Sequence, residues 1–426
     1  MLYSRVLSDL LGGPVYLKCE NLQRTGSFKV RGAYARIARL SAAERARGVV
    51  AASAGNHAQG VAFASGLLGT RATVVMPSRA PIPKVQATRA YGASVLLHGD
   101  SVEDALSEAL RLAAADGSVF IHPFDHADVI AGQGTLGYEI VEQCPQARTI
   151  LVPSGGGGLA AGVAVAAKSL DPGIRVVGVQ AAEVAPYPLS LAAGHPVPVD
   201  GGPTIADGIA VRRPGDIAYG ILSALGDGFL TVSEAELSRA LLLCLERAKQ
   251  VVEPAGAAAV AALLSAAGSA AGSVAKPAGS PAKPPAGPSA KPPAGSVAGP
   301  PAEPSAKPPI EPPAEPSIEP PVVAVLSGGN IDPLLLSKLL RHGLSADGRY
   351  LGFRCRLPDH PGSLAELLGF LAGLGANVIE VSHDRLGPSL RVGEVEVVLQ
   401  VETRGPEHCA DVKGKLKAVG YALDFG

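Results

Sequence analysis

Residues 149–160 read TILVPSGGGGLA, and this stretch decides the fold. A short apolar run, a cluster of glycines and then an Ala-rich segment are typical of a buried strand that turns directly into a helix. The same order recurs along the chain, in runs that begin at residues 48, 72, 93, 175 and 322 as GVVAAS, ATVVMP, ASVLLHG, RVVGVQAAE and VVAVLSGGN. This alternation predicts an α/β fold with a largely parallel sheet.

The composition narrows the class of protein. The chain has 426 residues, enough for two domains, and its 37 Lys and Arg against 38 Asp and Glu give a net charge of −1. No basic cluster alternates with aromatic residues, so we expect no nucleic-acid partner. No apolar run reaches the length of a membrane span, and the start MLYSRVLSDLLGG lacks the order of a signal peptide, so we expect a cytoplasmic protein. Small neutral metabolites are the expected partners.

The five cysteines indicate no structural role for disulfides. They are scattered, odd in number and without CxxC spacing. This pattern favours reduced thiols over a disulfide framework or a zinc site. We therefore expect no metal bound through cysteine.

A low-complexity segment lies at about 268–321, where units such as AKPPAGP and EPPAEPS recur with almost no large apolar residues. Such a composition cannot bury a core and predicts a disordered or polyproline-like loop. The Ala-rich helix before it and the strand VVAVLS after it both have core character, so the loop is expected to interrupt one catalytic domain, residues 1–347. A linker between two domains is the alternative.

The pattern of elements restarts at residue 348. A strand in RYLGFRCRL, the turn DHPG, a helix, two strands, a second helix and a short last strand follow one another up to residue 426. This βαββαβ order predicts a ferredoxin-like module.

Lys29 is the first candidate for chemistry. It follows Gly26, Ser27 and Phe28 and opens a predicted helix. A cation is disfavoured at a helix N-terminus, and partial burial also lowers the pKa of an ammonium group, so the neutral amine that a Schiff base requires becomes accessible. A surface lysine at a helix start is the alternative.

The turn Ser53, Ala54, Gly55, Asn56, His57 is the second candidate. Small residues between a strand and a helix let backbone amides approach an anion, which suits an amino-acid carboxylate. The Asn56 side chain can also donate a hydrogen bond to a phenolic oxygen. An ordinary capped turn is the alternative.

The glycine-rich turn of residues 154–159 is the third candidate. Four glycines can point consecutive amides inward at a helix N-terminus and so form a phosphate cradle. Gly155 to Ala160 also fits the dinucleotide fingerprint GxGxxA, with Glu183 as a possible ribose partner. Ser327 ends the strand VVAVL, where a hydroxyl can face a ligand crevice, or simply mark a turn.

Taken together, these segments resemble the serine/threonine dehydratase family of fold-type II enzymes that use pyridoxal 5'-phosphate (PLP). The resemblance rests on KxENxQxTGSFKxRGA, SAGNHAQG, HPFDxxxxIAGQGT, PxGGGGL, TIADGIAV, ExAGAA and SGGNID, which follow in this order over nearly the whole chain. It implies two open, mainly parallel α/β subdomains. The segment DHPGSL resembles the start of an ACT domain, and points to the threonine ammonia-lyase form.

The resemblance also implies the roles of single residues. Lys29 would carry PLP and act as the general base, and residues 53–57 would hold the substrate carboxylate. The cofactor would be bound by Phe28, Lys29, Asn56, Gly155, Gly156, Gly157, Gly158, Leu159, Gly208 and Ser327. Asn56 would touch the ring O3′, and Ser327 would face the pyridine nitrogen.

The implied reaction converts L-threonine to 2-oxobutanoate and ammonia, and L-serine to pyruvate, with isoleucine biosynthesis as the expected role. Serine dehydratase and serine racemase are the alternatives within the fold; Ala54 stands where the racemases have a serine. Glu183 is followed by Val-Ala-Pro-Tyr-Pro-Leu rather than by acidic residues, so no racemase-type metal site is expected. A Rossmann dehydrogenase and a non-enzymatic amino-acid sensor are the alternatives outside the fold.

The C-terminal module is expected to bind an amino-acid effector and to join copies of the chain. The resemblance places such a ligand at Asp359, His360, Pro361 and Gly362. A small module of this kind completes its core by pairing with another copy, so we expect a homodimer or homotetramer. A dimerisation module without a ligand is the alternative.

Overall fold

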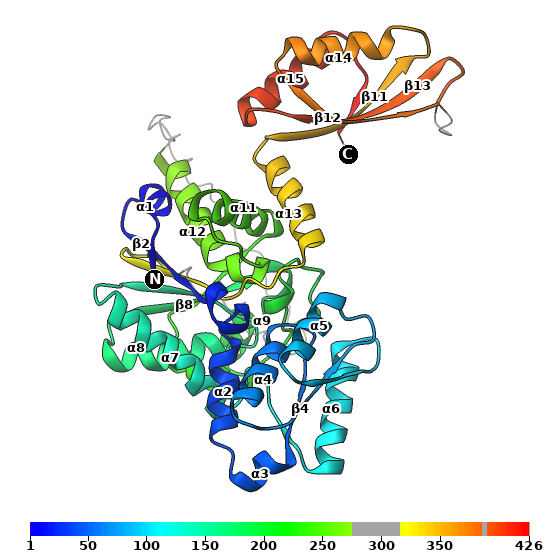
Figure 1. Cartoon of the computed structure of the whole chain (residues 1–426). Helices are drawn as coiled ribbons and strands as arrows, with labels where there is room; N and C mark the ends of the chain where they lie inside the picture. The colour runs from blue at the N-terminus through cyan, green and yellow to red at the C-terminus, as the bar shows by residue number, and fades with distance from the viewer. Residues whose placement is uncertain (275–315, 386–389, 426) are drawn as a thin grey trace, which may run out of the picture.

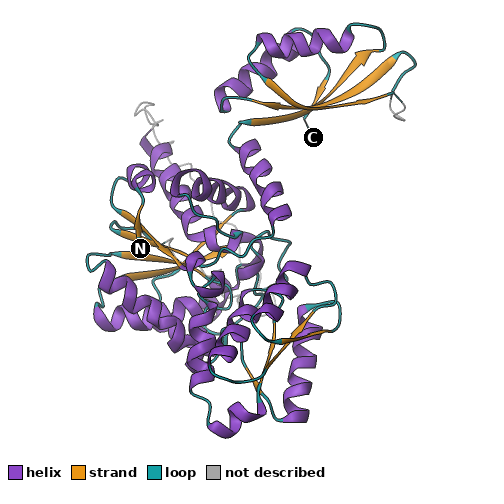
Figure 2. Ribbon diagram, viewed as in Figure 1, coloured by secondary structure: helices purple, strands orange, loops and turns teal. Residues whose placement is uncertain are grey.

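The computed structural model describes residues 1–274, 316–385 and 390–425. Two mainly parallel sheets with helices on both faces form the larger part of the molecule, and a third, antiparallel sheet stands at its C-terminal end (Figures 1 and 2). The predicted α/β class is confirmed.

The larger sheet has the strand order β1-β2-β10-β7-β8-β9. Only the pair β1 and β2 is antiparallel. The strands are β1 (Leu2–Tyr3), β2 (Val15–Cys19), β7 (Thr149–Pro153), β8 (Arg175–Ala181), β9 (Phe229–Val232) and β10 (Val322–Leu326).

Side chains of these strands alternate between two cores. In β7, Leu151 joins the core on the side of α12, whereas Ile150 and Val152 join the core on the side of α7 and α8. Both faces are buried, which explains why the strands are continuous apolar runs in the sequence.

The helices around this sheet are α1 (Arg5–Leu11), α7 (Ala127–Gln143), α8 (Gly158–Leu170), α9 (Pro186–Ala193), α10 (Asp216–Leu225), α11 (Glu234–Leu243), the π-helical turn η5 (Cys244–Ala248), α12 (Pro254–Val274) and α13 (Pro333–Ala346).

The smaller sheet has the order β5-β4-β3-β6 and is parallel throughout. Its strands are β3 (Val49–Ala52), β4 (Ala72–Met76), β5 (Ser94–Leu97) and β6 (Val119–Phe120), and its helices are α2 (Lys29–Ala38), α3 (Ala42–Arg47), α4 (Asn56–Leu67), α5 (Ile82–Ala90) and α6 (Val102–Asp116). Helix α2 packs against both α4 and α7, and so joins the two sheets. Short 3-10 turns are η1 (Glu20–Leu22), η2 (Arg24–Gly26), η3 (Ala182–Val184) and η4 (Asp207–Ile209).

The Pro/Ala-rich range falls between α12 and β10. Because β10 lies between β2 and β7, strands from before and after this range belong to one sheet. The described ends of the range expected to be disordered, about 268–321, are structured. Helix α12 continues to Val274, and near the other end Thr149 Oγ1 donates to the Glu319 carbonyl at 2.9 Å, while the Arg148 amide donates to the Pro321 carbonyl at 2.8 Å. Hydrogen bonds from the Thr149 side chain and the Arg148 backbone thus hold the end of the range beside β7. Residues 275–315 lie outside the described residues.

The C-terminal sheet has the order β12-β13-β11-β14. Its elements follow as β11 (Tyr350–Pro358), α14 (Ser363–Gly373), β12 (Asn377–Asp384), β13 (Glu394–Glu402), α15 (Pro406–Ala418) and β14 (Leu423–Asp424). This is the βαββαβ order expected of a ferredoxin-like module, with its own core around Phe353, Leu371 and Leu399. Helix α13 links it to the rest of the chain (Figure 1).

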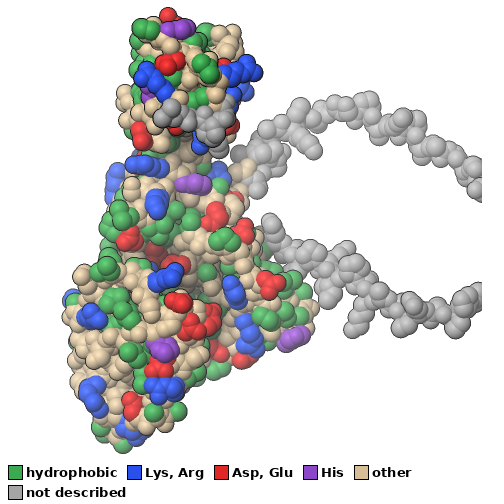
Figure 3. Space-filling model, turned by 90° about the vertical axis from the view of Figure 1, so that its right-hand side faces the viewer, with side chains coloured by type: hydrophobic (Ala, Val, Ile, Leu, Met, Phe, Trp, Pro, Cys, Tyr) green, Lys and Arg blue, Asp and Glu red, His purple; other side chains and the backbone are tan. Residues whose placement is uncertain are grey.

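Two surface properties bear on partners. On the face drawn in Figure 3, basic and acidic side chains are interspersed, and neither kind gathers into one large patch. No helix within the described residues is long and apolar enough to cross a membrane.

Candidate active site

A pocket opens where β7 and β10 end and where α2, α4 and α8 begin. Segments far apart in the chain meet here, as expected at the carboxyl ends of parallel strands. All the residues predicted to bind the cofactor line it: Phe28, Lys29, Asn56, Gly155, Gly156, Gly157, Gly158, Leu159, Gly208 and Ser327.

The glycine-rich turn forms a cradle that larger residues would close. Gly157 has φ of 95°, and a Cβ there would lie 1.8 Å from the Tyr187 hydroxyl. A Cβ on Gly156 would lie 2.3 Å from the Phe124 ring, and one on Gly158 would lie 2.4 Å from the Phe124 carbonyl. Because α8 begins at Gly158, free amides and the helix dipole face the pocket, which suits a phosphate group.

Lys29 is the first residue of α2 and reaches into the same pocket. Its Nζ donates to the Pro123 carbonyl at 2.8 Å and lies 5.3 Å from the centre of the Phe28 ring. Burial lowers the pKa of Lys29 to about 8, against a weaker opposite effect of Glu253. A reactive, partly neutral amine is therefore held by a single carbonyl.

The Asn56 side chain stands between two polar partners. Its Nδ2 donates to Glu253 Oε1 at 2.6 Å, and its Oδ1 accepts from Asn330 Nδ2 at 2.8 Å. Asn330 Nδ2 also donates to the Thr25 carbonyl at 2.6 Å. The orientation of the Asn56 amide is thus set from both sides.

Of the predicted substrate-binding turn, only Asn56 is among the residues that line the pocket. Within the turn, the Gly55 amide donates to Ser53 Oγ at 3.1 Å, and Ala54 is half-buried. The His57 ring is buried, with Nε2 bonded to the Ile121 carbonyl at 2.8 Å. Burial, reinforced by Lys29, lowers the pKa of His57 to about 3, so this ring is neutral and its side chain supports the fold.

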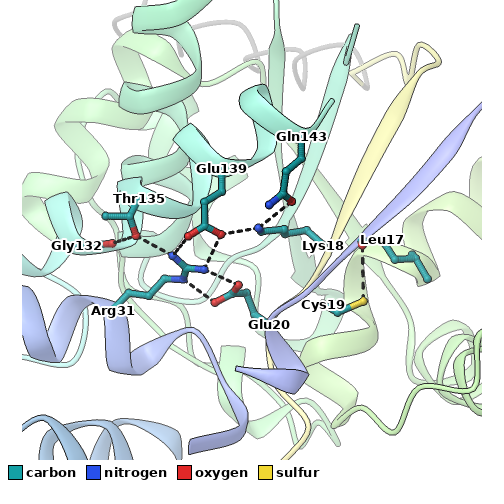
Figure 4. Close-up of polar contacts among 9 residues, drawn as sticks. All are labelled: Leu17, Lys18, Cys19, Glu20, Arg31, Gly132, Thr135, Glu139 and Gln143. Carbon is teal, nitrogen blue, oxygen red and sulfur yellow. Dashed lines mark hydrogen bonds and ion pairs between the residues drawn. The ribbon is translucent and has the colours of Figure 1, made fainter. Parts of the chain in front are cut away.

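A network of ion pairs fixes the helix that carries Lys29 (Figure 4). Arg31 binds Glu20 through Nε and Nη2 at 2.7 and 2.9 Å, and Glu139 through Nη1 and Nη2 at 2.7 and 2.8 Å. Lys18 Nζ donates to Glu139 at 2.5 Å. Burial opposes ionisation of Glu139, but the hydrogen bonds from Arg31 and Lys18 lower its pKa to about 2. The network joins β2, η1, α2 and α7 by charge-assisted bonds.

The predicted effector turn lies far along the chain and on the surface. Asp359, His360, Pro361 and Gly362 are all exposed. Asp359 pairs with Arg385 at 3.3 Å, and His360 Nδ1 bonds to Ser363 Oγ at 3.0 Å. The structure places these four residues together at the start of α14, outside the pocket described above.

Sequence reasoning missed several residues of the pocket. Glu253, Pro123 and Phe124 line the pocket. The motifs ExAGAA and HPFDxxxxIAGQGT contain these residues, but the sequence assigns them no role of their own. Gln133 also lines it, and its buried Oε1 has no hydrogen-bond partner in the described part of the chain. No spacing rule marks a backbone carbonyl or a supporting phenyl ring, whereas a glutamate within an apolar stretch, VVEPAGAA, was a detectable signal.

Comparison with known proteins now bears on this geometry. The family model described as pyridoxal-phosphate dependent enzyme matches residues 1–275. The chain belongs to this family. The predicted cofactor and enzyme class are thereby confirmed.

The relatives include proteins that match almost the whole chain. An L-threonine ammonia-lyase of Thermotoga maritima is 42% identical over 421 residues, which cover 99% of this chain and 93% of the relative. Among solved structures, the processed form of threonine deaminase isoform 2 from Solanum lycopersicum has a TM-score of 0.66 and 35% identity, over 80% of this chain and 86% of that one. Maize serine racemase has a TM-score of 0.65 and 31% identity, over 81% and 92%. These likenesses confirm the fold-type II architecture.

No group of three or more potential metal ligands gathers among the residues that the structure describes. The expectation that the chain binds no metal stays a prediction.

Proposed function

We propose that this protein is a PLP-dependent L-threonine ammonia-lyase, which forms 2-oxobutanoate and ammonia and also acts on L-serine. The observation that carries the proposal is the meeting of Lys29, the glycine cradle and Ser327 in one pocket. The name of the Thermotoga maritima relative, which matches nearly the full length, gives the substrate class.

The residues present fit PLP. The amides of Gly155 to Gly158 would hold the phosphate, Phe28 and Gly208 would flank the ring, and Asn56 would donate to the ring oxygen O3′. Ser327 would face the pyridine nitrogen with a hydroxyl, which leaves that nitrogen unprotonated. When bound, PLP supplies an electron sink for the carbanion that forms at the substrate Cα.

Lys29 would remove the proton from the substrate Cα. Its lowered pKa, about 8, makes a fraction of the amine neutral near physiological pH, and the Pro123 carbonyl holds that amine in place. The backbone amides of residues 53–57, at the start of α4, would bind the substrate carboxylate. Overall, the Cα proton and the β-hydroxyl would be lost as one molecule of water, and hydrolysis of the released enamine would give the 2-oxo acid and ammonia.

Serine racemase is the second candidate, favoured by the structural likeness to the maize enzyme. Racemisation needs an acid or base on each face of Cα. Ala54 carries no such group, so elimination is the better supported reaction.

Residues 1–347 form the proposed catalytic domain, and residues 348–426 the proposed ACT-like regulatory domain. An amino-acid effector at Asp359 to Gly362, assembly into a homodimer or homotetramer, a cytoplasmic location and a role in isoleucine biosynthesis are parts of the same proposal. The exposure of this turn leaves it open to a ligand or to a second copy.

The test is a product assay on the purified protein with L-threonine and L-serine. We expect 2-oxobutanoate and pyruvate, each with one equivalent of ammonia, and a higher kcat/KM for threonine. Formation of D-serine from L-serine without keto acid would support the racemase instead. Absence of any product, with PLP bound, would refute both.

A further inference from the structure

Glu253 is a buried carboxyl group for which the proposed reaction has no use. Only 6% of its surface is exposed, and it lies in the pocket directly before α12. Its backbone amide donates to the Gly328 carbonyl at 3.0 Å, and a Cβ on Gly328 would lie 2.3 Å from Glu253 Oε1. The strand end that carries Ser327 and the Glu253 carboxyl are thus packed closely together.

The Asn56 amide is the direct partner of this carboxyl. Asn330 Nδ2 already donates to the Thr25 carbonyl and to Asn56, so the atom of Asn56 that faces Asn330 must be the acceptor Oδ1. The opposite atom is then Nδ2, which gives one hydrogen to Glu253 at 2.6 Å. Its second hydrogen has no partner in the described part of the chain and remains for a ligand of the pocket.

We propose that Glu253 is a positioning residue, which holds the Asn56 amide so that its remaining N–H is presented to the ring oxygen of PLP. This inference rests on the proposed placement of the PLP ring beside Asn56. Asn330 fixes the acceptor end of the amide and Glu253 fixes the donor end. A carboxylate accepts but cannot donate, so the charged form of Glu253 opposes the flipped amide from the donor end, as Asn330 does from the acceptor end.

The charge of Glu253 depends on its surroundings. Burial, with help from Asp207, raises the pKa of Glu253 to about 7, whereas the hydrogen bond from Asn56 and the charges of Lys84 and Lys29 oppose the rise. These groups come from η4, α4, α5 and α2. The carboxylate is therefore formed as pH rises through about 7, and the full positioning effect exists above that pH.

The experiment measures PLP binding by the apoenzyme, from cofactor absorbance and fluorescence, in wild type, Glu253→Gln, Glu253→Leu, Asn56→Ala and the two double variants with Asn56→Ala. Glu253→Leu removes the acceptor and should raise the Kd about tenfold, the equivalent of one hydrogen bond to a charged group. Glu253→Gln retains an uncharged acceptor and should raise it about threefold. Asp227→Asn is the control, because Asp227 accepts from the Val176 amide at 2.7 Å and pairs with Lys168 without lining the pocket.

Three results support the inference together. Either Glu253 substitution has little further effect once Asn56 is alanine, which is the non-additivity expected of one unit. The difference between wild type and Glu253→Gln shrinks as pH falls from about 8 to about 6, because protonation removes the charge. The control variant leaves the Kd unchanged.

Other results separate the possible failures. Equal effects of Glu253→Leu with and without Asn56 would overturn the inference, because Glu253 would then act independently of the amide. An unchanged Kd in Asn56→Ala would instead refute the placement of the ring. Should Glu253→Leu not fold, the isosteric Glu253→Gln decides the same comparison through its coupling and its pH dependence.

Discussion

The turns at Gly157 and at Gly362 have the same local geometry and opposite surroundings. Each glycine precedes a helix as its N-cap residue, with φ of 95° and 102°. A Cβ on Gly157 would collide with the Tyr187 hydroxyl, whereas a Cβ on Gly362 would have no neighbour within 4 Å. The first turn is a finished cradle inside the protein, and the second is open on the surface.

The difference shows that the start of a helix becomes a preformed ligand cradle only where buried side chains pack around its turn. Gly157 is backed by the buried Tyr187, which stacks on Phe229 with ring centres 4.2 Å apart. The turn at Asp359 to Gly362 is held by an exposed ion pair and by a bond between His360 and Ser363. A preorganised cradle binds its ligand without being rebuilt, whereas an open turn must be completed by the ligand itself.

The largest effect is expected in the pocket that contains the Gly157 turn, at Lys29. Lys29→Ala should lower kcat by at least about 10⁴-fold, because in the proposed function one amine both carries PLP and moves the proton. Borohydride reduction of the wild-type protein with PLP, followed by peptide mapping, should label Lys29. Label on Lys18 or Lys84 instead would show that the assignment is wrong.

The two glycines give a direct test of the comparison. Gly157→Ala adds a collision with Tyr187 to the strain of a left-handed residue, so we expect a loss of about 3 kcal/mol in stability and at least a tenfold weaker PLP affinity. Gly362→Ala carries only the backbone strain and should cost about 1 kcal/mol, with PLP affinity unchanged. Thermal unfolding and PLP titration measure both. Equal loss of PLP in the two variants would remove the distinction between the regions.

Ion pairs extend the same contrast. Arg31 pairs with the buried Glu20 and the partly exposed Glu139, and Lys18 also pairs with Glu139. Arg31→Ala therefore deprives the buried Glu20 carboxylate of its ion-pair partner and should lower the unfolding free energy by about 3 kcal/mol. Lys415 pairs with Asp411 on the surface of α15, and Lys415→Ala should change it by less than about 0.5 kcal/mol. Denaturant titration of the apoenzymes decides, and similar losses would mean that the Arg31 network is no more important than a surface pair.

The contrast also explains what the sequence could predict. Strands β3, β7 and β10 are apolar runs that end in small or polar residues, so both the fold and the pocket positions Asn56, Gly157 and Ser327 could be found from local pattern and resemblance. Partnerships across hundreds of residues leave no local signal: Asn56 meets Glu253 and Asn330 only after the sheets have formed. The structured end of the Pro-rich range was missed for the same reason, since Glu319 and Pro321 are held by bonds to the β7 region rather than by their own composition.

The lowered pKa of Lys29 gives a smaller, pH-dependent effect. Its neutral form, the form that would react with PLP in the proposed function, increases as pH rises through about 8, whereas an exposed lysine would reach the same state only near its usual pKa of about 10.4. The rate of PLP attachment to the apoenzyme should therefore rise through about pH 8 and level off about one pH unit above it. Stopped-flow absorbance measures it. A rate that still rises above pH 9 would indicate that burial does not lower the pKa of this amine.

The smallest effect on chemistry is expected from removing residues 348–426, which contain the turn at Gly362. All residues that line the pocket precede residue 328, so a chain that ends at residue 347 should retain PLP and keep its basal kcat within about twofold. The cut removes the ion pair between Arg349 and Glu246, at 2.6 Å, whose side chains are both partly exposed. It also removes the packing of β11 on α13. If isoleucine or valine changes the rate of the full chain through the open turn at Asp359 to Gly362, the shortened chain should lose that response and form smaller oligomers, as rate assays and light scattering would show. If the shortened chain keeps both its oligomeric mass and its response, the effector site and the interface lie within residues 1–347. The exposed turn at Asp359 to Gly362 would then be only the start of α14.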